Sequence, residues 1–333
     1  MSVLAVRDLR VEYGTQQGPV PAVRGVDLRV EEGETLGLAG ESGCGKSTVA
    51  HAVLRLLPPS SRVTGSVLLD GDDVLSMTFG RLRTVRWNQA AIVFQGAMHA
   101  LNPVQRVGDQ VAEAIRIHDP KATERDAAGR AAALVERVGL HPGRSADYPH
   151  ELSGGQRQRI MIAMALACSP RLVIADEPTT ALDVMVQAQV LSVLKTIQQD
   201  LGLSLLFITH DLSVLAEMCD RIAVMYAGRI VEEGTADQVF DGPAHPYSRA
   251  LAGAFPRIGR AQDRRSPAGL GGDPPDPQDI PPGCSFHPRC PFRFAPCDEV
   301  DPPLLPAGEG RRAACLLFDP ELAPSRVPEG AER

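Results

Sequence analysis

The sequence predicts an α/β fold with a largely parallel sheet that is covered by helices on both faces. Residues 1 to about 240 alternate strand-like and helix-like segments with few long loops, which is typical of such folds. Four short apolar runs, at 35–39, 91–94, 172–175 and 203–208, indicate strands buried on both faces. Helices are predicted at 110–117, 122–138 and 184–201, the first two of them in a helical insert.

Size and composition describe the class of protein. The 333 residues suffice for one large α/β domain and an appendage, and 44% apolar with 23% charged residues is ordinary for a globular protein. No run approaches the roughly 20 apolar residues of a spanning helix. Arg7, Asp8 and Arg10 lie where a secretory signal needs apolar residues, so we expect a cytoplasmic location. The net charge of −7 disfavours a nucleic-acid partner.

The composition changes after about residue 256. The segment 266–282 is dominated by Pro, Gly and Asp and predicts a linker without regular structure. We therefore expect a domain at 1–240 with a helical subdomain at about 96–168, and a connecting helix region at 241–265. A compact cysteine-rich segment should follow at 283–318, and a flexible tail at 319–333.

The strongest local signal is a run that follows the strand at 35–39 and fits G-x-x-x-x-G-K-[ST]. Its glycines let backbone N–H groups turn inward around phosphate oxygens, and the next helix presents its positive N-terminal end. Lys46 supplies a charge for the β- and γ-phosphates, and Ser47 is left to bind magnesium. The plain alternative is a glycine-rich turn. The residues of this predicted ATP site are Gly40, Glu41, Ser42, Gly43, Cys44, Gly45, Lys46, Ser47 and Thr48.

Two acids end the strand at 172–175. Ligands of open α/β sheets bind outside the carboxyl ends of the strands, so Asp176 and Glu177 should emerge beside the phosphate loop. We expect Asp176 to help hold magnesium and Glu177 to orient and polarise the attacking water. A solvated acidic turn is the structural alternative.

His210 follows the strand at 203–208 and should reach the same edge of the sheet. An imidazole there can hydrogen-bond the γ-phosphate and so report its presence. Taken alone, a histidine at a strand end is more often structural, and its functional weight comes from the shared edge.

The run LSGGQRQR at 152–159, just before an apolar helix at 160–168, resembles the signature sequence of ABC ATPases. Ser153, Gly154, Gly155 and Gln156 make a second anion-binding helix start in a chain that already has a phosphate loop. The resemblance implies that this segment closes over ATP held by a facing subunit, so each dimer contains two composite sites. It also implies a P-loop ATPase domain of the ABC type, with a mainly parallel core sheet, an antiparallel β subdomain and a helical subdomain.

Other family elements follow in the expected order over residues 1 to about 235. The resemblance implies that Tyr13 stacks on adenine, that Gln95 binds magnesium and senses the γ-phosphate, and that the loop ending at Asp183 links the two sites. Because Glu177 and His210 are both present, the chain resembles a fully competent half-site, with Lys46 completing its catalytic set.

A finer resemblance is to the ATP-binding subunits of oligopeptide and dipeptide importers. It rests on FQ at 94–95 followed by ALNP at 100–103 and VGDQ at 107–110, which in that family lie near the docking surface for the membrane subunits. Gly96 and Ala97 depart from the acidic residue or proline expected there. HPY at 245–247 with RAL at 249–251 is a second shared feature, whose plain interpretation is a capped surface helix.

Four cysteines crowd into the C-terminal region: Cys284, Cys290, Cys297 and Cys315. Their intervals of five, six and seventeen residues match neither bacterial ferredoxins nor paired C-x-x-C zinc sites. Four thiolates suffice for a 4Fe-4S cluster or for zinc; related peptide-importer subunits carry a 4Fe-4S cluster in this region, and unligated thiols are the third option. Metal ligation can supply much of the folding energy of so small a segment. His287 is expected to be a loop residue.

The resemblance implies a peripheral protein at the cytoplasmic face of the membrane that hydrolyses ATP to drive solute import. Its implied partners are a homologous ABC ATPase subunit, favoured as a distinct paralogue, two transmembrane permease subunits and an extracytoplasmic substrate-binding protein. Peptides lead as cargo, with nickel complexes, sugars and other solutes as alternatives. A soluble ABC ATPase acting on nucleic acid or ribosomes is disfavoured by the single cassette, and a third hypothesis makes the cysteine tail a redox or iron sensor.

Overall fold

The computed structural model describes residues 2–96, 100–254 and 271–324. The chain divides into two compact units, which are described separately. The first unit comprises Met1–Ala5, Arg29–Thr35 and Val67–Ile208, and the second comprises Val6–Leu28, Leu36–Ser66 and Thr209–Arg333. Four expectations lie wholly or partly outside the described residues: Ala97, the connecting region from 255, the linker at 266–270 and the tail at 325–333.

The first unit contains a parallel sheet in the order β6-β7-β8, formed by Ala90–Val93, Leu172–Asp176 and Ser204–Ile208. Every residue of β7 and β8 is buried, as their continuous apolar sequence predicts. The register pairs Ala90 with Leu172, and Asp176 with Ile208. The carboxyl ends of β7 and β8 therefore lie at one edge of this sheet, where Glu177 follows β7.

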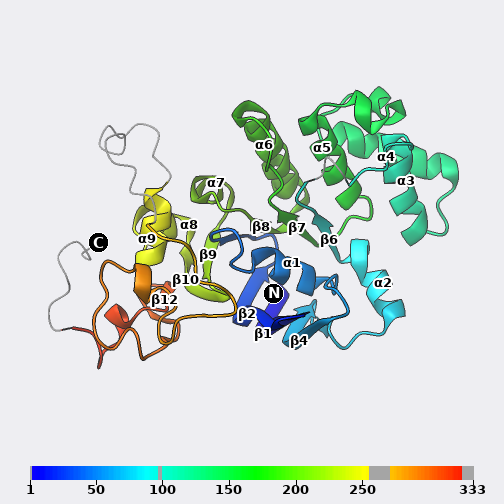
Figure 1. Ribbon diagram of the computed structural model, residues 1–333. Helices are drawn as coiled ribbons and strands as arrows, with labels where there is room; N and C mark the ends of the chain where they lie inside the picture. The colour runs from blue at the N-terminus through cyan, green and yellow to red at the C-terminus, as the bar shows by residue number, and fades with distance from the viewer. Residues whose placement is uncertain (1, 97–99, 255–270, 325–333) are drawn as a thin grey trace. The chain divides into compact units, whose positions relative to one another are not determined.

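Among the described residues, five α-helices belong to the first unit, and those at 107–118, 124–137 and 154–165 pack together (Figure 1). The predicted helices at 110–117, 122–138 and 184–201 are all present. Helix α5 begins six residues earlier than the predicted 160, because a hydrogen-bonded cap at Ser153 starts the helix on two glycines, and it ends at Ala165 rather than at 168. The five helices are α2 (Phe79–Asn88), α3 (Val107–His118), α4 (Glu124–Arg137), α5 (Gly154–Ala165) and α6 (Val184–Leu201).

The second unit carries the other predicted strand, β3 (Thr35–Ala39), which pairs in parallel with β9 (Arg221–Tyr226). Antiparallel strands follow, in the order β9-β10-β12-β11. The bounds are Arg229–Thr235 for β10, Arg312–Ala313 for β12 and Leu305–Pro306 for β11. The cysteine-rich segment is therefore not a separate appendage, because β12 pairs with β10 and continues the sheet.

The remaining strands of the second unit follow the order β2-β1-β4. Strands β1 (Ser2–Thr15), β2 (Gly18–Glu31) and β4 (Ser61–Leu69) are long, and each also contributes residues to the first unit. In the first unit, β4 forms a hairpin with β5 (Asp72–Asp73) through Leu68 and Asp73. Residues 271–282 contain neither helix nor strand.

The described part of the second unit also contains four α-helices: α1 (Lys46–Val53), α7 (Leu212–Met218), α8 (Ala236–Asp241) and α9 (Pro246–Gly253). Helix α9 is capped by His245, whose ring nitrogen accepts the Tyr247 N–H. The interpretation of α9 as a surface helix is wrong, because His245, Tyr247 and Ser248 are completely or almost completely buried. Among the described residues, no helix is both long and apolar enough to cross a membrane.

Candidate nucleotide site

The phosphate loop connects the fully buried strand β3 to helix α1. Two of its glycines are required by space as well as by backbone angle. A Cβ atom at Gly40 would lie 2.3 Å from the Met225 carbonyl oxygen, and one at Gly45 would lie 2.4 Å from that of Ala22. Both glycines have φ in the left-handed region, at 151° and 107°. These positions fix a tight turn at the start of α1, and the start of a helix favours an anion.

Lys46 is the first residue of α1 and is buried, with 5% of its surface exposed. Its ammonium group donates hydrogen bonds to the carbonyl oxygens of Gly40 (2.7 Å) and Glu41 (2.8 Å). The Cys44 sulfur lies 3.8 Å from the same nitrogen. Burial raises the pKa of the Cys44 thiol, so this side chain stays neutral beneath the loop. The loop carbonyls thus hold the Lys46 ammonium group at the turn for which the sequence predicts phosphate binding.

Tyr13 and His210 are both held next to this loop within the second unit. The Tyr13 hydroxyl lies 3.1 Å from that of Thr48 in α1. The Thr209 N–H donates to the carbonyl of Leu38 in β3 (3.3 Å), which positions His210 near the end of the strand that leads into the loop. Asp211 then caps α7. The stacking of Tyr13 on adenine and the role of His210 stay predictions.

Glu177 is constrained in both its backbone and its side chain. Its backbone is left-handed (φ 45°), and its N–H donates to the carbonyl of Ile208 in β8 (2.9 Å). Its carboxylate oxygen Oε2 accepts hydrogen bonds from the Gln95 amide and from the Thr180 hydroxyl, both at 2.9 Å. Asp176 ends β7 and is 2% exposed. The structure thus brings Gln95 and Glu177 together, and it adds Thr180, which the sequence analysis missed although it lies only three residues after Glu177.

The signature residues form the start of α5. The Gln156 N–H donates to the Ser153 hydroxyl (3.3 Å), and the Ser153 N–H donates to the Gln156 side chain (2.9 Å). A Cβ atom at Gly155 would lie 2.2 Å from a methyl of Val186 in α6, so only glycine fits there without movement. Asp183 caps α6 by accepting the Val186 N–H (3.0 Å). Helix α5 is therefore packed closely against the first turn of α6, which Asp183 caps.

The tail cysteines lie in one segment of the second unit and form no disulfide. The Cys284 N–H donates to the Cys297 carbonyl (2.9 Å). Burial raises the pKa of Cys315 to about 12 and that of Cys290 to about 11, and negative charge on the other tail cysteines acts in the same direction. Among the described residues, however, no three His, Cys, Asp or Glu side chains are grouped so that they could hold a metal ion. The expected metal site is therefore not supported by the geometry.

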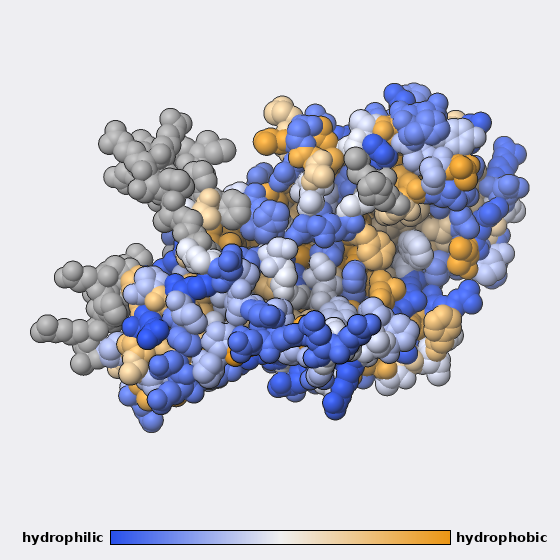
Figure 2. Space-filling model, viewed as in Figure 1, coloured by the Kyte–Doolittle hydropathy of each residue, from blue (hydrophilic) through white to orange (hydrophobic). Residues whose placement is uncertain are grey.

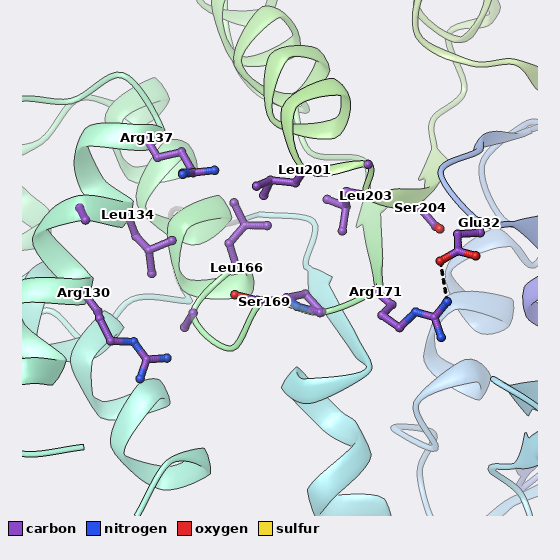
Figure 3. A pocket seen from close by; sticks show the side chains of 14 residues that line it. Glu32, Arg130, Leu134, Arg137, Leu166, Ser169, Arg171, Leu201, Leu203 and Ser204 are labelled. Carbon is purple, nitrogen blue, oxygen red and sulfur yellow. Dashed lines mark hydrogen bonds and ion pairs between the residues drawn. The ribbon is translucent and has the colours of Figure 1, made fainter. Parts of the chain in front are cut away.

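A cavity of about 520 Å³ lies elsewhere in the first unit, next to the amino ends of β7 and β8 (Figure 3). Arg130, Leu134 and Arg137 of α4 face it from one side, and Leu166 and Leu201 face it from another. Arg171 at its edge forms ion pairs with Glu32 and Asp70. None of the predicted site residues lines this cavity, which separates it from the nucleotide chemistry.

Solved structures give the class of the fold. The chain is similar to an ATP-binding cassette solved as a dimer in a post-hydrolysis state with ADP and Pi, at a TM-score of 0.63 and 27% identity over 70% of this chain and 98% of the other. It is also similar to cbiO1 of Clostridium perfringens, part of an ABC transporter complex, at a TM-score of 0.62 and 29% identity over 72% and 91% of the two chains. The fold is that of an ABC ATPase cassette.

Two family models match the sequence: "ABC transporter" at residues 23–180 and "Oligopeptide/dipeptide transporter, C-terminal region" at residues 231–297. Similar curated proteins include the oligopeptide transport ATP-binding protein OppD of Mycobacterium tuberculosis, 46% identical over 94% of this chain. The dipeptide transport ATP-binding protein DppD of Bacillus subtilis is 44% identical over 95% of each chain, and OppD of Escherichia coli is 42% identical over 95% of this chain and 93% of its own.

The chain spans about half the length of the mycobacterial relatives it matches, 52%, and nearly the full length of the others. It belongs to the family of ATP-binding subunits of oligopeptide and dipeptide ABC transporters.

Proposed function

We propose that this chain binds and hydrolyses ATP and thereby powers an importer of di- or oligopeptides. The observation that supports hydrolysis most directly is the hydrogen-bonded group of Gln95, Glu177 and Thr180 at the end of the buried strand β7. The cargo is supported by relatives named as oligopeptide and dipeptide transport proteins, which match at least 94% of this chain.

Catalysis by this chain is mostly positioning and charge neutralisation. The ammonium group of Lys46 and the N–H groups of the loop bind phosphate oxygens. Ser47, Asp176 and Gln95 each offer a side-chain oxygen, the kind of ligand that Mg²⁺ prefers, and would hold this ion. Bound Mg²⁺ would neutralise charge on the phosphates.

Glu177 acts on water rather than on phosphate. Because two donors fix one of its oxygens, the carboxylate is oriented before substrate binds, and it can align and polarise an attacking water. His210 donates a hydrogen bond to the γ-phosphate and so makes the site sensitive to whether the phosphate is still attached.

A cassette of the homologous partner subunit completes each site. Ser153, Gly155 and Gln156 present the start of α5 to ATP held by the partner, with Gly154 between them and Asp183 in the linking loop. Val184 and Met185, which directly follow Asp183, are 81% and 71% exposed, and Figure 2 shows apolar side chains on the surface over α6. Exposed apolar side chains at this position support burial against another protein surface.

The chain works at the cytoplasmic face of the membrane as a peripheral subunit. Its partners are a homologous ATPase subunit, two permease subunits that convert closure into alternating access, and a substrate-binding protein that acts through the permeases. The family assignment supports each of these partners by resemblance.

Isolation of the tagged chain from gently solubilised native membranes tests this assembly. We expect two membrane proteins and a second ATPase to co-purify, and the complex should hydrolyse ATP faster when a di- or oligopeptide and the binding protein are added. Co-purification of ribosomal proteins without membrane subunits would overturn the proposal. If a nickel complex stimulated ATP hydrolysis and peptides did not, the cargo would be a nickel complex rather than a peptide.

We also propose that Cys284, Cys290, Cys297 and Cys315 hold a 4Fe-4S cluster rather than one zinc ion. The support for the cluster is the resemblance of this segment to peptide-transport subunits, whose C-terminal family model matches residues 231–297.

The metal content of the anaerobically purified chain tests this assignment. We expect about four iron atoms per chain, with visible absorption, and loss of both in Cys297→Ser. Cys219→Ser, a buried cysteine outside the tail, is the matched control and should keep the iron. Stoichiometric zinc, or no metal at all, would contradict the cluster.

A further inference from the structure

Glu41, the second residue of the phosphate loop, is anchored through all of its polar groups. Its N–H donates to the hydroxyl of Tyr247 in α9 (2.8 Å), and its carbonyl accepts from Lys46 (2.8 Å). Its carboxylate accepts two parallel hydrogen bonds from the guanidinium group of Arg289, at 2.8 and 3.0 Å. Two of these three anchors come from residues more than 200 positions later in the chain, within the same compact unit.

The ion pair between Arg289 and Glu41 is largely buried. The two side chains are 8% and 22% exposed. Arg289 also donates to the hydroxyl of Tyr226 (3.3 Å) and to the carbonyl of Gly271 (3.0 Å). Bidentate arginine–carboxylate pairs fix both partners in orientation, and removing one partner of a buried pair leaves an uncompensated charge. The geometry therefore restrains Glu41 far more than an exposed surface pair would.

The position of Arg289 is set by the fold of the cysteine-rich segment. Arg289 ends a short 3-10 turn, His287–Arg289, directly after the buried Phe286. The ring of Phe286 packs edge-on against those of Tyr226 and Tyr247, with centroids 5.3 and 5.5 Å apart. Hydrogen bonds from the His287 N–H to the Cys284 carbonyl and from the Cys290 N–H to the His287 carbonyl complete the turn.

The outer side of the phosphate loop faces the same C-terminal region. A cavity of about 110 Å³ lies between residues 41–44 of the loop and Pro274, Pro275, Pro277 and Ile280. The C-terminal region therefore supplies part of the cavity wall, and Pro21, Ala22 and residues 226–228 supply the rest. A change in the C-terminal region alters the surroundings of Glu41.

We propose that Arg289 is a positioning residue for ATP binding, which holds Glu41 and thereby makes the shape of the phosphate loop depend on the folded state of the cysteine-rich segment. The inference rests on the proposed ATPase function of the chain and is independent of its cargo. Arg289 acts through Glu41 and the loop backbone, so its loss weakens nucleotide binding while the groups around Glu177 keep their geometry.

The test uses the complete chain in its isolated transporter complex, with a fluorescent ATP analogue and Mg²⁺. In Arg289→Gln we expect the Kd for nucleotide and the KM for ATP to rise five-fold or more, and kcat to change less than two-fold. Glu41→Gln should give the same pattern while leaving the cysteine-rich segment intact. The double variant should bind nucleotide as tightly as the weaker-binding single variant, because both substitutions remove the same interaction.

Arg312→Gln is the matched control. Arg312 of β12 pairs with Glu233 of β10 (2.6 Å) and so also joins the C-terminal region to the sheet. Its ion pair does not involve the phosphate loop. Arg312→Gln should leave the Kd unchanged. Any of three results would overturn the proposal. The nucleotide Kd could stay within two-fold of wild type in both Arg289→Gln and Glu41→Gln, or the two increases in Kd could multiply in the double variant. Arg312→Gln could also raise the Kd as much as Arg289→Gln does. A wild-type chain that binds no ATP would instead contradict the proposed function.

Discussion

At the scale of single residues, Glu177 combines an unfavourable backbone with a fixed side chain. A left-handed conformation costs a non-glycine residue on the order of 1–3 kcal/mol, and it persists only where the surroundings impose it. Here the Ile208 carbonyl holds the N–H, and Gln95 and Thr180 hold the carboxylate. This conformational strain at the end of a buried strand supports a catalytic role for the Glu177 side chain rather than a stabilising one.

Glu177→Gln should therefore keep ATP binding and lose most turnover. The amide can still accept from Gln95 and Thr180, but it cannot serve as a base, and we expect kcat to fall by about 100-fold or more. Steady-state hydrolysis and nucleotide affinity of the assembled complex measure the two effects. Glu136→Gln, an exposed acid on α4, should change neither. Unchanged hydrolysis in Glu177→Gln would remove Glu177 from its proposed role.

His245 makes folding sensitive to acid. Complete burial lowers its pKa to about 3, and its ring is fixed by accepting the Tyr247 N–H and donating to the Ala314 carbonyl. Because the unfolded state takes up the proton near pH 6.5 and the folded state does not, stability is lost as the pH falls from about 6.5 toward 3. Between pH 7 and pH 5 the loss is about 2 kcal/mol.

In His245→Asn, whose side chain can still cap α9, this part of the pH dependence should disappear. Urea unfolding at pH 7 and pH 5 measures it. Burial raises the pKa of Glu232, which acts in the opposite direction but equally in both proteins. His150→Asn, at an exposed position, is the control and should keep the wild-type slope. An unchanged slope in His245→Asn would show that His245 is not the titrating group.

At the scale of elements, the close contact of α5 with α6 depends on Gly155. Since valine is stiff in a helix, Val186 cannot move aside freely for an added methyl. We expect Gly155→Ala to lower the free energy of unfolding by about 1–3 kcal/mol. When Val186 is already replaced by alanine, Gly155→Ala should lower the free energy of unfolding much less than it does in the wild type.

Gly129→Ala in α4 is the matched control, because a methyl there meets nothing within 4 Å. It should stabilise the chain by about 0.5–1 kcal/mol, as alanine favours a helix. Urea unfolding gives both values. If Gly155→Ala and Gly129→Ala changed the free energy of unfolding equally, the close packing of α5 on α6 would be contradicted.

Some of the strands and contacts can be predicted from the sequence, and others cannot. The strands at 35–39 and 172–175 follow from continuous apolar runs, and the acids after β7 follow from the rule for strand ends. Strand β12 could not be predicted, because two residues carry no periodicity and its partner β10 lies about 80 positions earlier. The pair of Arg289 with Glu41, 248 positions apart, depends entirely on tertiary packing.

At the scale of the whole molecule, the elements that hold the phosphate loop and those that hold Glu177 belong to two different compact units. Residues from the beginning and from the end of the chain surround the loop, whereas the middle of the chain supplies Gln95, Glu177 and the signature helix. The proposed ATP hydrolysis draws on residues of both sets.

The central claim is that ATP hydrolysis by this chain powers peptide import, and uptake of a labelled oligopeptide by intact cells tests it most directly. Cells that produce only the Glu177→Gln form should lose uptake to the level of cells without the chain, although the complex still assembles. Cells with the wild-type form should take up the peptide. Equal uptake with the wild-type and Glu177→Gln forms would contradict the claim.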